Sequence, residues 1–182
     1  MTISYTRDRV WWKEPLERTE LVWIVIALVW CLIMFFMMPY WHLYGQQNLA
    51  NEAYRAKPAD FSAKTEEMIA KYKVREEGGE LKVPVVRPPA GSDVYLIARL
   101  WSWYPMLELE AGKSYRIHLM SMDWLHGFSL QPENINIEVH PNYDHVVTLT
   151  PTRAGTYGII CNEYCGINHA AMVSRLYVVK PK

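Results

Sequence analysis

Two cysteines, a histidine and a methionine lie within twelve consecutive residues near the C-terminal end of the sequence. The stretch "CNEYCGINHAAM", residues 161–172, contains Cys161, Cys165, His169 and Met172. A disulfide is one interpretation if the cysteines face an oxidising compartment, but it has no use for the other two side chains. Structural zinc is a second, although methionine is not among its usual ligands. Thiolate, imidazole and thioether on one loop are instead the ligands of copper electron-transfer sites.

The first cysteine raises the number of metal ions that this stretch could hold. Cys165, His169 and Met172 would suffice for a single copper, so Cys161 offers a second thiolate. Two bridging thiolates can hold two coppers, which then need one more imidazole. Among the other histidines, His126 is the best candidate, because it ends a strand pattern and precedes a glycine.

The segments around this stretch show the alternation of β-strands. From Ser92 onward, apolar and polar residues alternate in segments such as "VYLIARLWSW", "MLELEAG", "YRIHL", "INIEV" and "RLYVV", separated by turn residues. The pattern predicts a mainly β domain, an antiparallel sandwich or barrel of about 90 residues. It treats "VYLIARLWSW" as one strand with Trp101 and Trp103 on the same face. It also places Glu108 and Glu110 on one exposed strand face.

An uncharged apolar segment near the N-terminus predicts a membrane anchor. Residues 21–38, "LVWIVIALVWCLIMFFMM", carry no charge, and tryptophan and tyrosine flank them. A helix of this length can cross a hydrocarbon core of roughly 30 Å. A cleaved signal peptide is the alternative, but the apolar run is longer than usual and no A-x-A-like site follows.

Basic residues are more frequent before the apolar segment than after it. The positive-inside rule therefore places the N-terminus in the cytoplasm and the rest of the chain outside. The residues that carry this asymmetry are Arg7, Arg9, Lys13 and Arg18 before the segment, and Arg55 and Lys57 after it.

A polar connector follows, and it contains one amphipathic pattern. In "PADFSAKTEEMIAKYK", Phe61, Met68, Ile69 and Tyr72 share a helical stripe that could face a neighbouring protein or lipid head groups, or belong to a simple spacer. The sequence thus predicts four segments: a cytoplasmic segment over 1–19, a transmembrane helix over 20–41, a connector over 42–91 and a β domain over 92–182. The net charge is zero and no long basic block is present, which argues against binding nucleic acid.

The two motifs "DWLHGFSLQPENINIEV" and "AGTYGIICNEYCGINHAAM" together resemble the CuA domain of subunit II of heme-copper oxygen reductases. The single anchor and "HGF…NINIEV" are most similar to the B-type cytochrome c oxidases. The resemblance implies a cupredoxin Greek-key sandwich that holds a binuclear copper centre. It implies that Cys161 and Cys165 bridge both coppers, that His126 and Met172 complete one, and that His169 and the backbone carbonyl of Glu163 complete the other.

The same resemblance assigns roles to residues near these ligands. Asp123 matches an acidic residue that fixes nearby groups and tunes the potential of the site. The side chain of Glu163 matches a position that reaches magnesium at a subunit interface in A-type oxidases, whereas B-type relatives often carry glutamine there. Trp101, with Trp103 beside it, is the expected point of electron input, although A-type subunits read "QWYW" where this chain reads "ARLWSWYP". The alternative is that both tryptophans simply cap the sandwich.

The resemblance also implies a function and partners. The chain would be the electron-input subunit of a cytochrome c oxidase, anchored in lipid in a prokaryotic inner (plasma) membrane with its copper domain on the periplasmic side. A c-type cytochrome would be the donor, and a heme in the catalytic subunit I the acceptor, for oxygen reduction coupled to proton translocation. Glu17 and Glu20 are candidates for a proton-channel opening, or simply acids at a helix N-terminus.

Two alternatives share the same residues. A nitric oxide reductase can use a CuA subunit with this loop, and a membrane-tethered copper-delivery protein would catalyse nothing. The complete ligand set argues against delivery, because a buried copper pair is hard to release. The acids that could attract a donor are few and scattered, which predicts a largely apolar docking surface: they are Glu108, Glu110, Glu133, Glu138 and Asp144.

Overall fold

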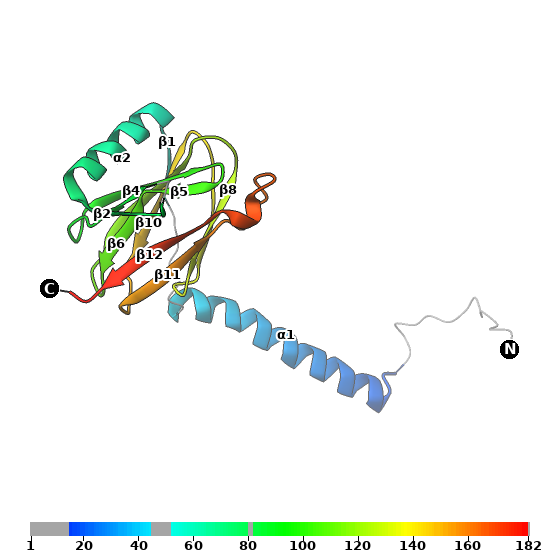
Figure 1. Cartoon of the computed structure of the whole chain (residues 1–182). Coiled ribbons are helices and arrows are strands. Elements are labelled where there is room, and N and C mark those ends of the chain that lie inside the picture. The colour runs from blue at the N-terminus through cyan, green and yellow to red at the C-terminus, as the bar shows by residue number, and fades with distance from the viewer. Residues whose placement is uncertain (1–14, 45–51, 80–81, 182) are drawn as a thin grey trace. The chain divides into compact units, whose positions relative to one another are not determined.

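The computed structural model describes residues 15–44, 52–79 and 82–181 (Figure 1). The chain divides into two compact units, residues 1–47 and 48–182. Residues 1–14 lie outside the described range, and with them most of the predicted cytoplasmic segment and three of the basic residues that predict its orientation.

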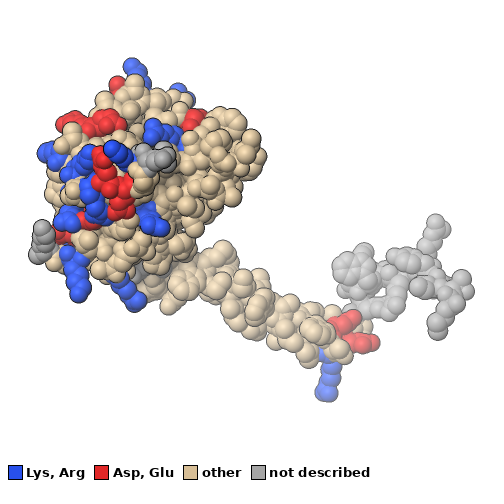
Figure 2. Space-filling view, viewed as in Figure 1, with Lys and Arg blue, Asp and Glu red and all other residues tan. Residues whose placement is uncertain are grey.

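Among its described residues, 15–44, the first unit contains one helix, α1 (Arg18–Tyr44), whose 27 residues are long and apolar enough to cross a membrane. At about 1.5 Å per residue the helix is longer than a hydrocarbon core of roughly 30 Å. Its side chains are exposed on all sides, as expected for a helix whose surroundings are lipid. Figure 2 shows charged side chains on α1 only at its N-terminal end. The carboxylate of Glu20 accepts a hydrogen bond from the backbone N of Glu17 at 3.0 Å, and so caps the helix.

The second unit is a sandwich of two β-sheets. One sheet has the order β1-β10-β7-β4-β5 and the other the order β2-β3-β6-β12-β11-β8-β9. The strands of the first sheet are β1 (Glu52–Arg55), β4 (Asp93–Arg99), β5 (Ser102–Tyr104), β7 (Tyr115–Ser121) and β10 (Tyr143–Leu149). Those of the second are β2 (Lys73–Glu77), β3 (Val83–Val86), β6 (Met106–Glu110), β8 (His126–Gln131), β9 (Ile135–Val139), β11 (Gly155–Ile160) and β12 (Val173–Val179).

The mainly β prediction is confirmed, but the sheets are mixed rather than purely antiparallel. β4 pairs with β7, β6 with β12 and β3 with β6 in parallel. Between the two strands of each pair, the chain forms at least one strand of the other sheet and then returns. The core lies between the sheets and consists of the inward-facing side chains of alternate strand positions. Its largest fully buried members include Leu96, Leu107, Leu119, Phe128, Leu130 and Ile159.

The segment predicted as one strand over "VYLIARLWSW" is a hairpin. β4 ends at Arg99, a turn follows at Leu100 and Trp101, and β5 returns with Trp103 opposite Ala98. Trp101 and Trp103 therefore do not share a strand face, contrary to the prediction. Neither turn residue is a usual turn former, so the sequence carries no signal for this reversal.

Helix α2 (Pro58–Tyr72) packs against this unit's own sheet. Phe61 lies with Ile97 of β4 and Met120 of β7 in a small apolar cluster, while Met68 and Ile69 join the main core. Pro58 occupies the first turn, where its missing N–H leaves no helical hydrogen bond unmade. The apolar stripe of the predicted amphipathic helix is therefore buried within the chain itself.

Candidate metal centre

Residues 161–172, called the cysteine loop below, connect β11 to β12 at one end of the sandwich. The backbone N of Cys161 donates to the carbonyl of Met172 at 3.1 Å and closes the base of the loop. A short 3-10 helix, η3 (His169–Ala171), leads into Met172, and the backbone N of Met172 bonds the carbonyl of His169. Gly166 has a φ of +111°, a conformation that side-chain-bearing residues avoid, so the turn in the middle of the loop depends on glycine.

The two thiol groups of this loop face one another inside the protein. The Sγ atoms of Cys161 and Cys165 are 3.7 Å apart, and the residues are only 3% and 0% exposed. A disulfide requires about 2.05 Å, and both cysteines are free. Because metal–thiolate bonds are about 2.3 Å long, two sulfur atoms at this separation can both bind the same ion.

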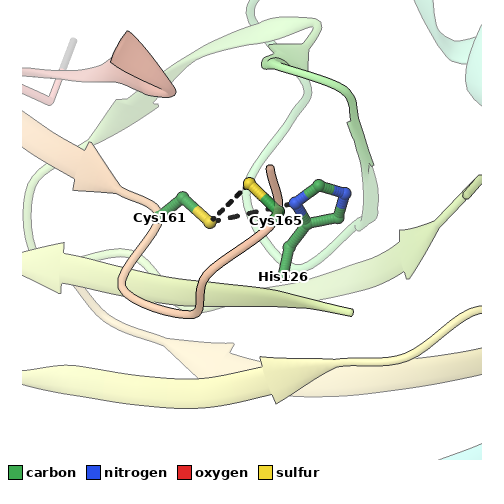
Figure 3. A group of neighbouring side chains, drawn as sticks. All are labelled: His126, Cys161 and Cys165. Atoms are coloured by element: carbon green, nitrogen blue, oxygen red, sulfur yellow. Dashed lines mark hydrogen bonds between the residues drawn. The ribbon is translucent and has the colours of Figure 1, made fainter. Parts of the chain in front are cut away.

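His126 brings an imidazole to the two sulfurs from β8. The residue is fully buried, and its Nδ1 lies 3.8 Å from Sγ of Cys161. Figure 3 shows a ring nitrogen of His126 directed toward the sulfur of Cys161, which approaches from the opposite side. One ligand atom from each of His126, Cys161 and Cys165 lies within 4.8 Å of the other two, a separation that a single metal ion can span.

Three further donors surround the sulfur pair. Nδ1 of His169 lies 3.6 Å and Sδ of Met172 lies 3.8 Å from Sγ of Cys165, while the carbonyl O of Glu163 lies 3.3 Å from Sγ of Cys161. The structure thus brings all six predicted ligand residues together. Two thiolates, two imidazoles, a thioether and a carbonyl form a donor set that suits copper, and methionine is unusual for zinc.

Burial favours the protonated form of Cys165. Desolvation, and then the neighbouring Cys161 thiol, raise the pKa of Cys165 well above its usual value. Without a metal, this side chain therefore keeps its proton at neutral pH, because a lone thiolate would be poorly solvated. A bound metal supplies the missing positive charge, and binding releases the thiol proton.

Asp123 holds His126 in place. Its Oδ1 lies 2.7 Å from Nε2 of His126 and also accepts the backbone N–H of Trp124, while its Oδ2 accepts that of Leu100. Burial alone would raise the pKa of Asp123, but these hydrogen bonds outweigh it and lower the pKa below its usual value. An ionised Asp123 accepts a hydrogen bond from Nε2–H of His126, which leaves the Nδ1 lone pair of His126 free to face the sulfurs.

The two predicted electron-input tryptophans occupy different environments. Trp101 is half-buried in the β4–β5 turn, and its Nε1 donates to the carbonyl of Cys165 at 3.2 Å. Trp103 is 2% exposed and packs edge-on against the rings of His126 and Phe128. Trp101 therefore connects the surface to the cysteine loop, whereas Trp103 belongs to the core.

The exposed face predicted for Glu108 is wrong. Glu108 is 3% exposed, and its carboxylate is paired with the guanidinium groups of Arg75 and Arg87. Both arginines come from the segment predicted as a connector, which contributes strands to the same sheet as β6. Alternation assigned Glu108 to a face of the sheet but carried no information about what covers that face.

Exposed apolar residues next to the site were not predicted. Trp124 is 59%, Tyr164 78% and Ile167 92% exposed, and Leu100 is exposed in the β4–β5 turn. Each of these residues lies within a few positions of a predicted ligand or electron-input residue. Their sequence position could therefore have indicated that they lie next to the site. On the face shown in Figure 2, acidic and basic side chains are interspersed elsewhere on the domain, while the side formed by the cysteine loop is largely uncharged.

Comparisons with known proteins identify the family. A sequence model described as "Cytochrome C oxidase subunit II, periplasmic domain" matches residues 105–179, which include every predicted ligand but neither Trp101 nor Trp103. A cytochrome c oxidase subunit 2 of Thermus thermophilus is 35% identical over 109 residues, which cover 58% of this chain and 81% of that protein. A second subunit 2 from the same species is also 35% identical over 109 residues, which cover 65% of its length.

Two solved structures support the fold. A structure of a heme-copper terminal oxidase dimer aligns with 89% of this chain and 100% of that chain, at a TM-score of 0.56 and 19% identity. A variant of the copper protein rusticyanin aligns with 72% of this chain and 100% of its own, at a TM-score of 0.51 and 19% identity. These likenesses indicate a cupredoxin-like sandwich. With the sequence matches across the ligand region, they lead to one conclusion: the chain belongs to the cytochrome c oxidase subunit 2 family.

Proposed function

We propose that this chain is the electron-input subunit of a cytochrome c oxidase and holds a binuclear CuA centre. The observation that carries the proposal is the pair of buried thiol groups 3.7 Å apart, with donors from His126, His169, Met172 and Glu163 around them. A blue single-copper site uses one thiolate, so the second thiolate, with a second imidazole and a carbonyl beside it, supports a site for two ions.

The ligands divide between the two ions. Cys161 and Cys165 would hold both ions, His126 and Met172 would complete the ligands of one, and His169 with the carbonyl of Glu163 would complete those of the other. When bound, the copper pair supplies one-electron transfer between a c-type cytochrome and a heme in the catalytic subunit. The soft sulfur donors favour Cu(I), and the imidazoles suit both oxidation states.

Protein groups around the ligands keep the site rigid and dry. Asp123 fixes the ring of His126, and the core side chain of Trp103 packs against the same ring. The hydrogen bond from Trp101 to the carbonyl of Cys165 gives a short covalent and hydrogen-bonded connection from the surface to a bridging ligand. Trp101 is therefore the proposed point of electron input, and Trp103 a packing residue behind it.

The membrane and partner assignments follow from the family and from α1. α1 would anchor the chain in the lipid of a prokaryotic inner membrane, with the N-terminus in the cytoplasm and the copper domain on the periplasmic side. The catalytic heme-bearing subunit would reduce oxygen with coupled proton translocation. The names of the relatives, cytochrome c oxidase subunits, support the oxidase part of this proposal. Glu17 and Glu20 are the proposed proton-channel residues, although Glu20 also caps α1. The Glu163 side chain is the proposed contact to magnesium.

Copper loading of the full chain in detergent tests the central assignment. We expect two coppers per chain, and an EPR hyperfine pattern from one unpaired electron shared by two copper nuclei. One copper per chain with the spectrum of a mononuclear blue site would overturn the binuclear assignment. In the assembled complex, consumption of oxygen but not of nitric oxide would distinguish the oxidase from the reductase.

A further inference from the structure

The cysteine loop crosses the end of the neighbouring strands at one glycine. β11 pairs with β8 through Gly158, Ile159 and Ile160, and the backbone N of Asn162 continues this pairing by donating to the carbonyl of Gly127 at 3.3 Å. Gly127 directly follows His126 on β8, so the loop lies against the strand that supplies its histidine.

The side chain of Asn162 passes over Gly127. A Cβ atom at position 127 would lie 2.0 Å from Oδ1 of Asn162 and 2.8 Å from the backbone N of Glu163. Real Cβ atoms do not approach other atoms so closely, and part of this contact is with backbone that cannot rotate away. Gly127 is therefore required for the loop to lie at this depth on β8.

Beyond Gly127, the same side chain reaches the next strand. β9 lies on the far side of β8, and Nδ2 of Asn162 donates to Oδ1 of Asn136 on β9 at 2.8 Å. One side chain thus spans β8 and joins the cysteine loop to the edge of the sheet. The bond between Asn162 and Asn136 is the only side-chain hydrogen bond between the loop and β9 among the described residues.

We propose that Gly127, Asn136 and Asn162 form a loop clamp that positions two of the metal ligands. Glu163 follows Asn162 in the loop, and its carbonyl O lies 3.3 Å from Sγ of Cys161. Asn162 itself follows Cys161 directly. A shift of Asn162 therefore moves a thiolate ligand and a carbonyl ligand together, relative to His126 on β8. The clamp rests on the proposed function for its purpose, but its geometry does not depend on a bound metal.

The copper-free full chain in detergent gives a direct test, because both thiols are buried. We would measure alkylation of Cys161 and Cys165 by mass spectrometry, which separates them from exposed Cys31. Loss of the hydrogen bond in Asn136→Ala should accelerate alkylation about fivefold by local opening of the loop. Asn136→Asp keeps an acceptor for Nδ2 and should restore the unmodified rate. Gly127→Ala should accelerate alkylation by roughly tenfold or more.

Gly158→Ala is the matched control. Gly158 lies on the adjacent strand β11, and a Cβ there would meet no heavy atom of the described chain within 4 Å. The Gly158→Ala variant should therefore leave the alkylation rate of Cys161 and Cys165 unchanged. In copper-loaded chains, Asn136→Ala should shift the visible spectrum and the reduction potential, and Asn136→Asp should return both toward the unmodified values.

Three results would overturn the clamp: an unchanged alkylation rate in Asn136→Ala, no rescue by Asn136→Asp, or equal rates in Gly127→Ala and Gly158→Ala. Circular dichroism identifies any variant that fails to fold. If Gly127→Ala fails to fold, Asn136→Ala still tests the clamp, because Asn136 is exposed and its substitution is mild. Copper stoichiometry of the unmodified chain tests the proposed function separately, so either idea can fail without the other.

Discussion

The Nε2 atom of His126 lies 2.7 Å from Oδ1 of Asp123, and the other oxygen of the same carboxylate accepts the backbone N–H of Leu100 at 2.7 Å. Asp123 therefore joins a proposed metal ligand on β8 to the β4–β5 turn. That turn also carries Trp101, whose indole bonds the carbonyl of Cys165. The proposed point of electron input and the proposed metal site thus share one carboxylate, and a change at Asp123 should affect both.

Asp123→Asn tests this connection. The carboxylate faces N–H groups of Leu100, Trp124 and His126, whereas an amide has one acceptor oxygen and presents an NH₂ group to the remaining donors. We expect a loss of about 1–3 kcal/mol in the free energy of unfolding and a shift in the copper reduction potential. Urea unfolding and potentiometric titration of the full chain would measure both. Glu110→Gln, a half-buried acid on β6, should change neither; equal behaviour of the two variants would contradict the positioning role.

Cys161→Ser and Met172→Leu should have unequal effects on copper. Cys161 is a proposed bridge to both ions, so serine should abolish the shared-electron EPR pattern and reduce the copper content. Met172 is a proposed weak ligand to one ion, so leucine should keep both coppers and change only the potential. Cys31→Ser removes an exposed thiol on α1 and serves as the control. Equal and mild effects at Cys161 and Met172 would show that the ligand roles are misassigned.

The grouping of the candidate ligands could be predicted because most of them lie in one short stretch. Cys161, Glu163, Cys165, His169 and Met172 fall within residues 161–172, and only His126 had to be found elsewhere. The fold class followed from period-two alternation and turn residues. These signals are local, and a single sequence contains them.

The β4–β5 hairpin and the environment of Glu108 could not be predicted, because they depend on contacts between distant segments. Ile97 and Ala98 are both buried, one under α2 and the other in the main core, so alternation at the end of β4 gave no sign of the turn. Glu108 pairs with Arg75 and Arg87, which are distant in sequence and become neighbours only when β2, β3 and β6 form one sheet.

Glu108 should make the stability of the domain pH-dependent. Burial would raise the pKa of Glu108, but the hydrogen bonds and charges of Arg75 and Arg87 outweigh it and hold the pKa below its usual value. The stabilisation is therefore present above the unfolded-state pKa of about 4.3, and is lost as the pH falls through the lower folded-state value. Glu108→Gln should cost roughly 1–3 kcal/mol at neutral pH.

Urea unfolding of the full chain across acidic and neutral pH would test this sign. The difference between the unmodified chain and Glu108→Gln should be constant above about pH 5 and shrink below about pH 4. Glu110→Gln again provides the control, since Glu110 lies on the same strand and has no ion-pair partner among the described residues. A difference that grows toward acidic pH would contradict the ion-pair explanation.

The donor cytochrome should dock mainly through apolar contact. Most of the acids that could attract it are engaged within the chain: Glu108 by two arginines, Glu133 by Thr152 and Tyr157, Glu138 by His140, and Asp144 by His118. Exposed Trp124, Tyr164 and Ile167 lie close in sequence to the proposed ligands instead. Because salt at 0.1 M screens exposed charges beyond about 10 Å, we expect only a shallow dependence of the reduction rate on ionic strength.

Stopped-flow reduction of the copper-loaded full chain by a c-type cytochrome would measure that rate. Trp124→Ala should weaken docking and lower the second-order rate constant, but leave the rate at saturating donor unchanged, because the exposed Trp124 side chain is proposed to act in docking alone. Trp101→Phe keeps an aromatic ring but loses the hydrogen bond to the carbonyl of Cys165, so it should also lower the rate at saturation. A rate that falls steeply between low and physiological salt, with no loss in Trp101→Phe or Trp101→Ala, would show that charge governs docking and that electrons do not pass through Trp101.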